Sequence, residues 1–357
     1  MESIYFLFIT ILARIIASNK TSEAVDSKEL FNPAYERLSF FSKISALTNC
    51  ITYDQLQENK TFLEGGCPLH LHFCSDISYN HFADQVIIKK IILAKNKFEL
   101  GTGFIAIDHH HQAIHMAFRG SSTRWDWLHD FSIAPTEYTP FSFKKYVKQV
   151  ELGNIPRCDD CKLHSGFNKF LSSLQESFLT TLENTYNSYP DYNLVISGHS
   201  LGAAVAVLCG LEVKIRGYNP TVVTYAQPKI FNSKMSQWVN EMFDIFTLDA
   251  SNRCHNTVDL KSGYYRLVHI NDYVTDLPPL YSHSGLQINI NKIMLPHEID
   301  DLSYVGLNYA SKNDIQASEK IVGPESLSID ETSLATDLLH LYEHRNYFIQ
   351  INECDYF

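Results

Sequence analysis

A serine and a histidine stand between two glycines in the stretch VISGHSLGAAVAVLCG, which begins at Val195. The spacing Gly198-x-Ser200-x-Gly202 is that of a nucleophile elbow, in which a strand turns sharply into a helix and lifts a serine hydroxyl above the edge of a sheet. A serine hydroxyl becomes an effective nucleophile only when a neighbouring base takes its proton. The motif therefore predicts a serine nucleophile, and the alternative is an ordinary glycine-rich turn.

The residues that flank the motif favour the nucleophile. Residues 192–197, YNLVIS, have the composition of a short buried strand, and residues 201–215, LGAAVAVLCGLEVKI, are typical of a helix that begins with small side chains. The amino end of such a helix carries a partial positive charge, and the backbone N–H of Leu201 is a candidate donor to an oxyanion. Strand, turn and helix together predict that Ser200 is a nucleophile.

A base and an acid for Ser200 are found further along the chain. In α/β-hydrolases the acid follows the serine and the histidine follows the acid. A strand-like run that begins at Tyr264 ends just before Asp272, which we predict to be the acid, with Asp276 as the alternative. Near the C-terminus the stretch LHLYEHRNYF offers His340 and His344 as the base.

Several short motifs follow one another along the chain: FRGSS, LHSGF, GHSLGAA, YAQPKI, NDYVTDLPP and EHRNYF. In these motifs the chain resembles the fungal class 3 triacylglycerol lipases, especially the secreted yeast members. The resemblance runs in register with that family from about Leu38 to the C-terminus. The resemblance matches Asp272 to the family acid, in an Asp-x-Val-Pro-like stretch, and His344 to the base, which precedes a Tyr-Phe pair by three residues. Two positions depart from the family pattern, with Thr275 in place of a usual proline and Ala203 in place of a usual glycine.

The resemblance implies one α/β-hydrolase domain over residues 25–357, with a central, mostly parallel sheet, flanking helices and a short helical lid at about 123–135. The implied activity is hydrolysis of carboxylic esters of lipids, above all triacylglycerols, at a lipid–water interface through an acyl-enzyme. No metal or cofactor is implied. A feruloyl-type esterase or phospholipase of the same fold and a non-catalytic lipid-binding protein are the alternatives.

Further roles follow from the same resemblance. Ser121 falls on the first oxyanion donor of the family, and Leu201 would be the second. His164 and His283 fall on family histidines that are not catalytic, and we expect both to be structural. The lid position contains a mixed apolar and polar stretch typical of a short amphipathic helix, for which a permanently buried helix is the alternative. The apolar residues expected to contact substrate are Trp125, Trp127, Leu128, Phe131 and Ile133.

The first 24 residues have the character of a signal peptide, with a cleavage point expected either at Ser22-x-Ala24 or near Ser18. Residues 4–13 form an apolar run that is too short to cross a bilayer. Glu2 and Arg14 depart from the usual pattern, so that a buried N-terminal helix is the alternative. We expect a secreted protein without stable membrane insertion, and the sequons at Asn19 and Asn59 agree with this expectation.

The eight cysteines also favour export. We predict three disulfides, with Cys209 as a buried apolar residue and Cys254 free. The competing interpretation is a zinc site built from the two close cysteine pairs, but a Cys-x6-Cys spacing matches zinc ligands poorly. The predicted bridges, which resemble those of yeast lipases, are Cys50–Cys354, Cys67–Cys74 and Cys158–Cys161.

Charge and the remaining motifs limit the partners of the chain. The formal net charge of −11 argues against binding to nucleic acid. The family resemblance implies a lipid ester and its interface as partners, and we expect a monomer. The stretch DHHHQ at 108–112 lies between two strand-like runs and predicts a hairpin turn rather than a metal site. The polar segment 311–333 is expected to be a surface loop.

Overall fold

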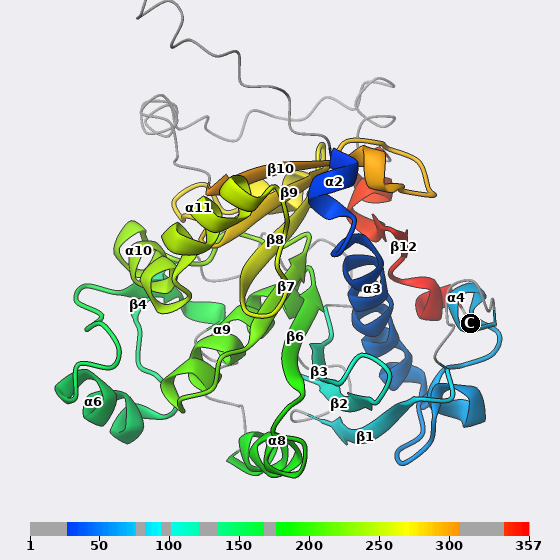
Figure 1. Ribbon diagram of the computed structural model, residues 1–357, viewed down its shortest axis with the longest axis horizontal. Helices are drawn as coiled ribbons and strands as arrows, with labels where there is room; N and C mark the ends of the chain where they lie inside the picture. Colours follow the sequence, from blue (N-terminus) through cyan, green and yellow to red (C-terminus); the bar gives the residue numbers. More distant parts are fainter. Residues whose placement is uncertain are drawn as a thin grey trace, which may run out of the picture.

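The computed structural model describes residues 27–75, 83–93, 101–120, 134–167, 176–307 and 339–356. Its centre is an eight-stranded sheet in the order β1-β2-β3-β6-β7-β8-β9-β10 (Figure 1). The strands of this sheet are β1 (Val86–Ile92), β2 (Gly103–Asp108), β3 (Ala113–Phe118), β6 (Asn193–His199), β7 (Thr221–Tyr225), β8 (Gly263–His269), β9 (Leu286–Ile290) and β10 (Leu302–Leu307).

The middle of the sheet is parallel. Strands β3, β6, β7, β8 and β9 run in one direction, whereas β1, β2 and β10 join the sheet through antiparallel pairs. The carboxyl ends of parallel strands meet at one edge of a sheet, so the segments that follow β6 and β8 lie near each other there. The predicted mostly parallel sheet is confirmed, and so are the predicted strand and helix on either side of Ser200.

Helices pack on both faces of the sheet. Successive side chains of a strand point to opposite faces, and β3 shows both directions. The ring of His115 packs against Phe41 of α3, with 5.5 Å between centroids, whereas Sδ of Met116 lies 3.3 Å from Sγ of Cys209 in α9. The α-helices are α2 (Ser27–Phe31), α3 (Tyr35–Cys50), α4 (His72–Ser75), α6 (Phe143–Glu151), α8 (Glu176–Ser188), α9 (Leu201–Ile215), α10 (Ser233–Met242) and α11 (Ile245–His255).

Short elements complete the described part of the fold. Among these residues, no helix has the length and apolar character needed to cross a bilayer. Two small antiparallel sheets pair β4 (Pro135–Glu137) with β5 (Lys162–His164) and β11 (Asn346–Tyr347) with β12 (Ile349–Gln350). The short helical turns are η1 (Ile51–Tyr53), η2 (Phe62–Gly66), η3 (Tyr273–Asp276), η4 (Ile299–Asp301) and η5 (Glu353–Tyr356).

The histidine-rich stretch DHHHQ is the turn between β2 and β3, which pair antiparallel. The buried carboxylate of Asp108 accepts bonds of 3.0 Å from the backbone N–H groups of His110 and His111, and it lies 2.6 Å from Nδ1 of His111. In the described ranges, no group of three histidine, cysteine or acidic side chains is arranged to hold a metal ion. The predicted hairpin is therefore confirmed.

Three disulfides form where the sequence predicts them, at Cys50–Cys354, Cys67–Cys74 and Cys158–Cys161. The first joins the end of α3 to the C-terminal segment across 304 positions of sequence. Of the two free cysteines, Cys209 is buried and Cys254 is exposed, as expected. Disulfides persist in oxidising compartments, so these bridges suggest secretion.

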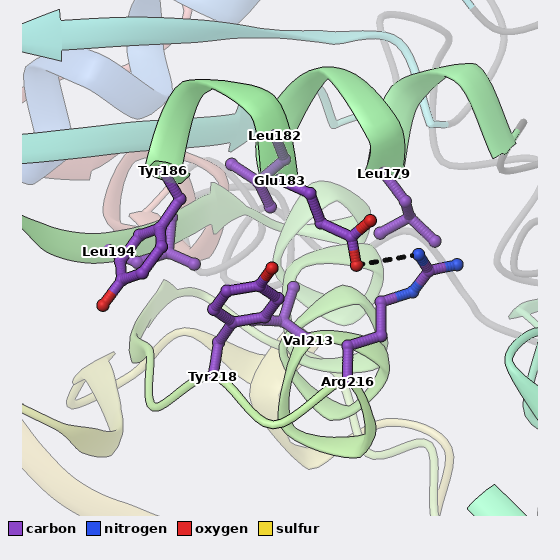
Figure 2. Close-up of a pocket in the computed structure, with 8 residues that line it drawn as sticks. All are labelled: Leu179, Leu182, Glu183, Tyr186, Leu194, Val213, Arg216 and Tyr218. Atoms are coloured by element: carbon purple, nitrogen blue, oxygen red, sulfur yellow. Dashed lines mark hydrogen bonds and ion pairs between the residues drawn. The ribbon is translucent and has the colours of Figure 1, made fainter. Parts of the chain in front are cut away.

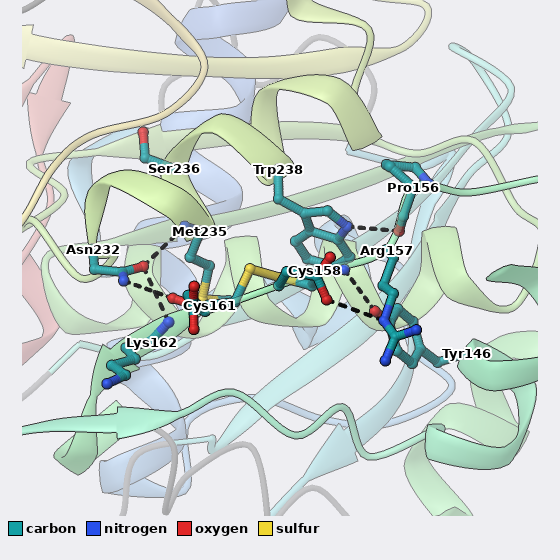
Figure 3. Close-up of a disulfide and its surroundings, with 12 residues drawn as sticks. Tyr146, Pro156, Arg157, Cys158, Cys161, Lys162, Asn232, Met235, Ser236 and Trp238 are labelled. Carbon is teal, nitrogen blue, oxygen red and sulfur yellow. Dashed lines mark hydrogen bonds and ion pairs between the residues drawn. A yellow bond between two sulfur atoms is a disulfide. The ribbon is translucent and has the colours of Figure 1, made fainter.

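The Cys158–Cys161 bridge packs against side chains from neighbouring elements (Figure 3). Nε1 of Trp238 in α10 donates a bond of 2.9 Å to the carbonyl of Pro156, and the backbone N–H of Cys158 donates a bond of 2.8 Å to the hydroxyl of Tyr146 in α6. These two hydrogen bonds hold the loop between α6 and β5 against α10 and α6.

Several predicted features lie outside the described residues. These are the signal peptide at 1–24 with the sequon at Asn19, the polar segment 311–333, and the lid at 123–135 except for its last two positions. The sequon asparagine Asn59 is described and is exposed at the surface.

Removal of the long-range bridge should cost more stability than removal of a short one. Cys50→Ala/Cys354→Ala is expected to lower the free energy of unfolding by about 2–5 kcal/mol, because the bridge restricts a very long loop in the unfolded chain. The matched control, Cys158→Ala/Cys161→Ala, opens a bridge across 3 positions and should cost less. Urea unfolding measures both values, and a larger loss in the control would contradict the account.

A thiol titration of the denatured, unreduced wild type should count two free thiols, those of Cys209 and Cys254.

Candidate active site

Ser200 occupies the turn between β6 and α9 in a strained backbone conformation. Its φ of 56° and ψ of −123° lie outside the regions that L-residues favour, as a nucleophile elbow requires. The two glycines make the turn possible, since a Cβ on Gly198 would lie 2.3 Å from the carbonyl oxygen of Gly202, and one on Gly202 would lie 2.2 Å from that of Phe118. The elbow therefore packs directly against the end of β3.

A histidine from the C-terminal segment lies beside this serine. Nε2 of His344 is 3.1 Å from Oγ of Ser200, and Nδ1 of His344 is 3.0 Å from each carboxylate oxygen of Asp272. Because an ionised carboxylate only accepts hydrogen bonds, Nδ1 carries the ring proton and Nε2 is free to take the proton of the serine. The three side chains have the geometry of a Ser-His-Asp triad.

Asp272 is buried just after β8, where three groups donate hydrogen bonds to it. The hydroxyl of Tyr347 lies 2.7 Å from Oδ2, the backbone N–H of Val274 lies 3.1 Å from Oδ1, and His344 supplies the third bond. Burial alone raises the pKa of Asp272, but the charge of His344 and the bonds from His344 and Tyr347 outweigh burial and hold this pKa below its ordinary value. Asp272 is therefore ionised at neutral pH and can orient the ring of His344.

The two alternative residues lie outside this chain of hydrogen bonds. The Asp276 side chain is exposed and forms an ion pair of 3.3 Å with Nζ of Lys229. His340 is half-buried, and its Nδ1 donates to the backbone carbonyl of Asn271. The structure thus brings together the predicted nucleophile, base and acid, and it leaves both alternatives elsewhere.

Known proteins are similar to this chain in sequence and in architecture. The family described as Lipase (class 3) matches residues 115–282. The Saccharomyces cerevisiae protein named "Putative lipase LIH1" is 42% identical over 320 residues, which are 90% of this chain and 94% of that protein. The chain belongs to the class 3 lipase family. A further relative, "Secreted mono- and diacylglycerol lipase 2" of Gibberella zeae, is 27% identical over 71% of this chain and 68% of its own.

Solved structures of fungal lipases have the same α/β-hydrolase fold. Lip2 lipase from Yarrowia lipolytica aligns with a TM-score of 0.64 at 22% identity, over 90% of this chain and 95% of that one. The mono- and diacylglycerol lipase from Aspergillus oryzae aligns with a TM-score of 0.60 at 21% identity, over 89% and 97%. The predicted fold class is confirmed.

Two further residues of this lipase form hydrogen bonds with the predicted base and acid, and sequence reasoning gives neither a role. Nε2 of His199, the residue before Ser200, donates a bond of 2.6 Å to the backbone carbonyl of His344. Burial, followed by the nearby charge of His344, lowers the pKa of His199 to about 3, so this ring stays neutral. The second residue is Tyr347, whose hydroxyl accepts from the backbone N–H of His269 and donates to Asp272. The only sequence signals for these two residues are their positions, since His199 immediately precedes Ser200 and Tyr347 lies three residues after His344.

Of the two predicted oxyanion donors, Leu201 lies within the described residues and Ser121 does not. Leu201 begins α9, and the N–H groups of a first helical turn have no partner within the helix. Ser121 lies outside the described residues, and so do the five apolar lid residues. Their assignment therefore stays a prediction.

The two histidines expected to be structural contact backbone groups. Nε2 of His283 donates a bond of 2.6 Å to the carbonyl of Thr275, beside the acid. Nδ1 of His164 accepts a bond of 3.2 Å from the backbone N–H of Gly166, and burial lowers the pKa of His164 to about 4. Both rings therefore support the loops around the site as neutral groups.

A hollow lies between α8 and α9 (Figure 2). Arg216, which lies there, follows the last residue of α9, whereas Ser200 precedes the first. A helix rises 1.5 Å per residue, so the two sites are separated by about 20 Å. Two of its lining residues, Arg216 and Glu183, form an ion pair of 3.0 Å. It is lined by Leu179, Leu182, Glu183, Tyr186, Leu194, Val213, Arg216 and Tyr218.

Substitution of the proposed nucleophile or base should remove ester hydrolysis. Ser200→Ala and His344→Ala are expected to lower kcat for a soluble short-chain ester by about 10⁴-fold or more, because members of a triad act as a unit. His340→Ala is the matched control and should retain most of the wild-type rate. A large loss in His340→Ala together with an active His344→Ala would contradict the assignment of the base.

Proposed function

We propose that this lipase hydrolyses triacylglycerols at a lipid–water interface, with Ser200 as nucleophile, His344 as base and Asp272 as the orienting acid. The observation that carries the proposal is the unbroken chain of hydrogen bonds from Oγ of Ser200 through His344 to a buried, ionised Asp272. A serine, a histidine and an acid in this chain can activate a hydroxyl at neutral pH.

The reaction follows from this geometry. Oγ of Ser200 attacks the acyl carbonyl carbon while Nε2 of His344 takes its proton, and the same nitrogen then gives that proton to the leaving glycerol oxygen. Asp272 holds the ring and stabilises the imidazolium. Water repeats the sequence on the acyl-enzyme and frees the fatty acid. The N–H of Leu201 and that of Ser121 would stabilise the oxyanion, and one such donor is typically worth about 10²–10³ in rate.

The lid at 123–135 would couple this chemistry to the interface. Its apolar residues would be unfavourable in water at about 25 cal/mol per Å² of apolar surface, whereas a lipid surface would bury them. Opening would therefore be favoured only at the interface, where the population shifts towards the competent state. The lid contributes Trp125, Trp127, Leu128, Phe131 and Ile133 to this surface.

We also propose that the protein is exported and acts as a glycosylated monomer. Three disulfides and relatives named as secreted lipases support export, for which residues 1–24 would be the signal peptide. The mature protein would be a monomer that carries a glycan at the exposed Asn59. Asn19 would carry one only if cleavage occurs before it, near Ser18.

A panel of substrates tests the proposed class. Rates on emulsified long-chain triacylglycerol should exceed those on mono- and diacylglycerols, phospholipids and feruloyl esters. A preference for phospholipid or feruloyl ester would overturn the substrate assignment.

A fluorophosphonate probe should label Ser200, because it reacts with activated serines, and an unlabelled protein would favour the non-catalytic lipid-binding alternative.

Activity on a long-chain ester should rise abruptly above the solubility limit of the ester. Trp127→Ser should blunt this rise, because the open lid would lose apolar surface that contacts lipid. The rate on a soluble short-chain ester controls for damage to the triad. A smooth saturation curve through the solubility limit, unchanged in Trp127→Ser, would point to an esterase without a lid function.

A further inference from the structure

A second buried carboxylate lies next to the base. Glu343 immediately precedes His344 and has no measurable exposure to solvent. Its Oε2 accepts a bond of 2.9 Å from the backbone N–H of Asn271, and its Oε1 accepts one of 2.8 Å from Nδ2 of the same residue. Asn271 in turn immediately precedes Asp272, so the residues before the acid and before the base form a pair of their own.

The two pairs join the same two segments of backbone. His344 meets Asp272 and Glu343 meets Asn271, in each case across 72 positions of sequence. Local backbone geometry cannot set a distance between segments so far apart, so tertiary contacts must do so. The Nδ1 atom of His269 strengthens the connection, since it lies 3.1 Å from the backbone carbonyl oxygen of Glu343.

The chemistry of the pair explains why a carboxylate stands at this position. Both groups that Asn271 presents are donors, and a carboxylate can accept from both at once. A glutamine of the same length would turn its own N–H₂ group towards one of these donors. Among the described residues, Glu343 forms no ion pair with a lysine, arginine or histidine, so its burial is compensated by these bonds.

We propose that Glu343 is a positioning residue for catalysis. Its two hydrogen bonds to Asn271, here called the clamp, keep the ring of His344 aligned with Asp272. This inference rests on the proposed function of the triad and adds a residue to it. A misplacement of reacting groups by about 1 Å can cost about 10²-fold in rate. The clamp therefore acts on the chemical step rather than on substrate binding.

The test is steady-state kinetics on a soluble short-chain ester, with rates expressed per active site titrated by a fluorophosphonate. Glu343→Ala should lower kcat by about 10²-fold and leave KM within about twofold, because orientation rather than binding is lost. Glu343→Gln should recover part of the loss, since its amide oxygen still accepts one bond. Asn271→Ala should lower kcat by about 10-fold, and Glu343→Ala/Asn271→Ala should be no slower than Glu343→Ala alone, because the two residues act through one contact.

His340→Ala is the matched control, since it removes a half-buried ring that bonds to the carbonyl of Asn271, and it should retain most activity. Should Glu343→Ala fail to fold, Glu343→Gln and Asn271→Ala carry the test. Unchanged kcat in these variants, or additive losses in the double variant, would overturn the positioning role. A wild type that neither hydrolyses esters nor reacts with the probe would instead overturn the proposed function.

Discussion

The contact between His344 and Asp272 constrains much of this structure, because a charged aspartate must be kept both buried and close to a histidine 72 positions away. Burial of an unpaired carboxylate is costly, and for the same reason the removal of one partner from a buried pair destabilises a fold by about 3–5 kcal/mol. The fold meets this requirement with donors from three places: the ring of His344, the hydroxyl of Tyr347 and the backbone of Val274. The lowered pKa of Asp272 means that its contribution to stability is present at neutral pH and is lost as pH falls through that pKa.

The parallel part of the sheet and the elbow supply the other half of the site. Parallel strands deliver the segments after β6 and β8 to one edge, so that Ser200 and Asp272 can share one histidine. The positive φ of Ser200 is tolerated because two glycines allow the turn to pack against the end of β3. His199 then joins the elbow to the backbone carbonyl of His344. The strained backbone of Ser200 is therefore held in place by packing and by hydrogen bonds around it.

Much of this arrangement could be predicted from the sequence. The elbow can be predicted because strand, glycines and helix are local signals, and the order of serine, acid and histidine points to the two segments that the structure brings to Ser200. The end of the strand before Asp272 already favours Asp272 over Asp276 as the acid. The choice of His344 over His340 rests on the family resemblance, which also agrees with Asp272. The supporting contacts could not be predicted: the bonds from His199 to the carbonyl of His344, from Tyr347 to Asp272 and from Asn271 to Glu343 join residues between 72 and 145 positions apart. No periodicity or composition records such pairs, since they depend on how the elements pack.

The most direct test of the central claim is to trap the acyl-enzyme. Rapid mixing of the lipase with an excess of a chromogenic short-chain ester should release a burst of close to one equivalent of alcohol per active site, if deacylation is slower than acylation. Acid quenching followed by peptide mass analysis should place the acyl group on the peptide that contains Ser200. Acylation of a residue other than Ser200 while hydrolysis continues, or a burst of undiminished size in Ser200→Ala, would contradict the account.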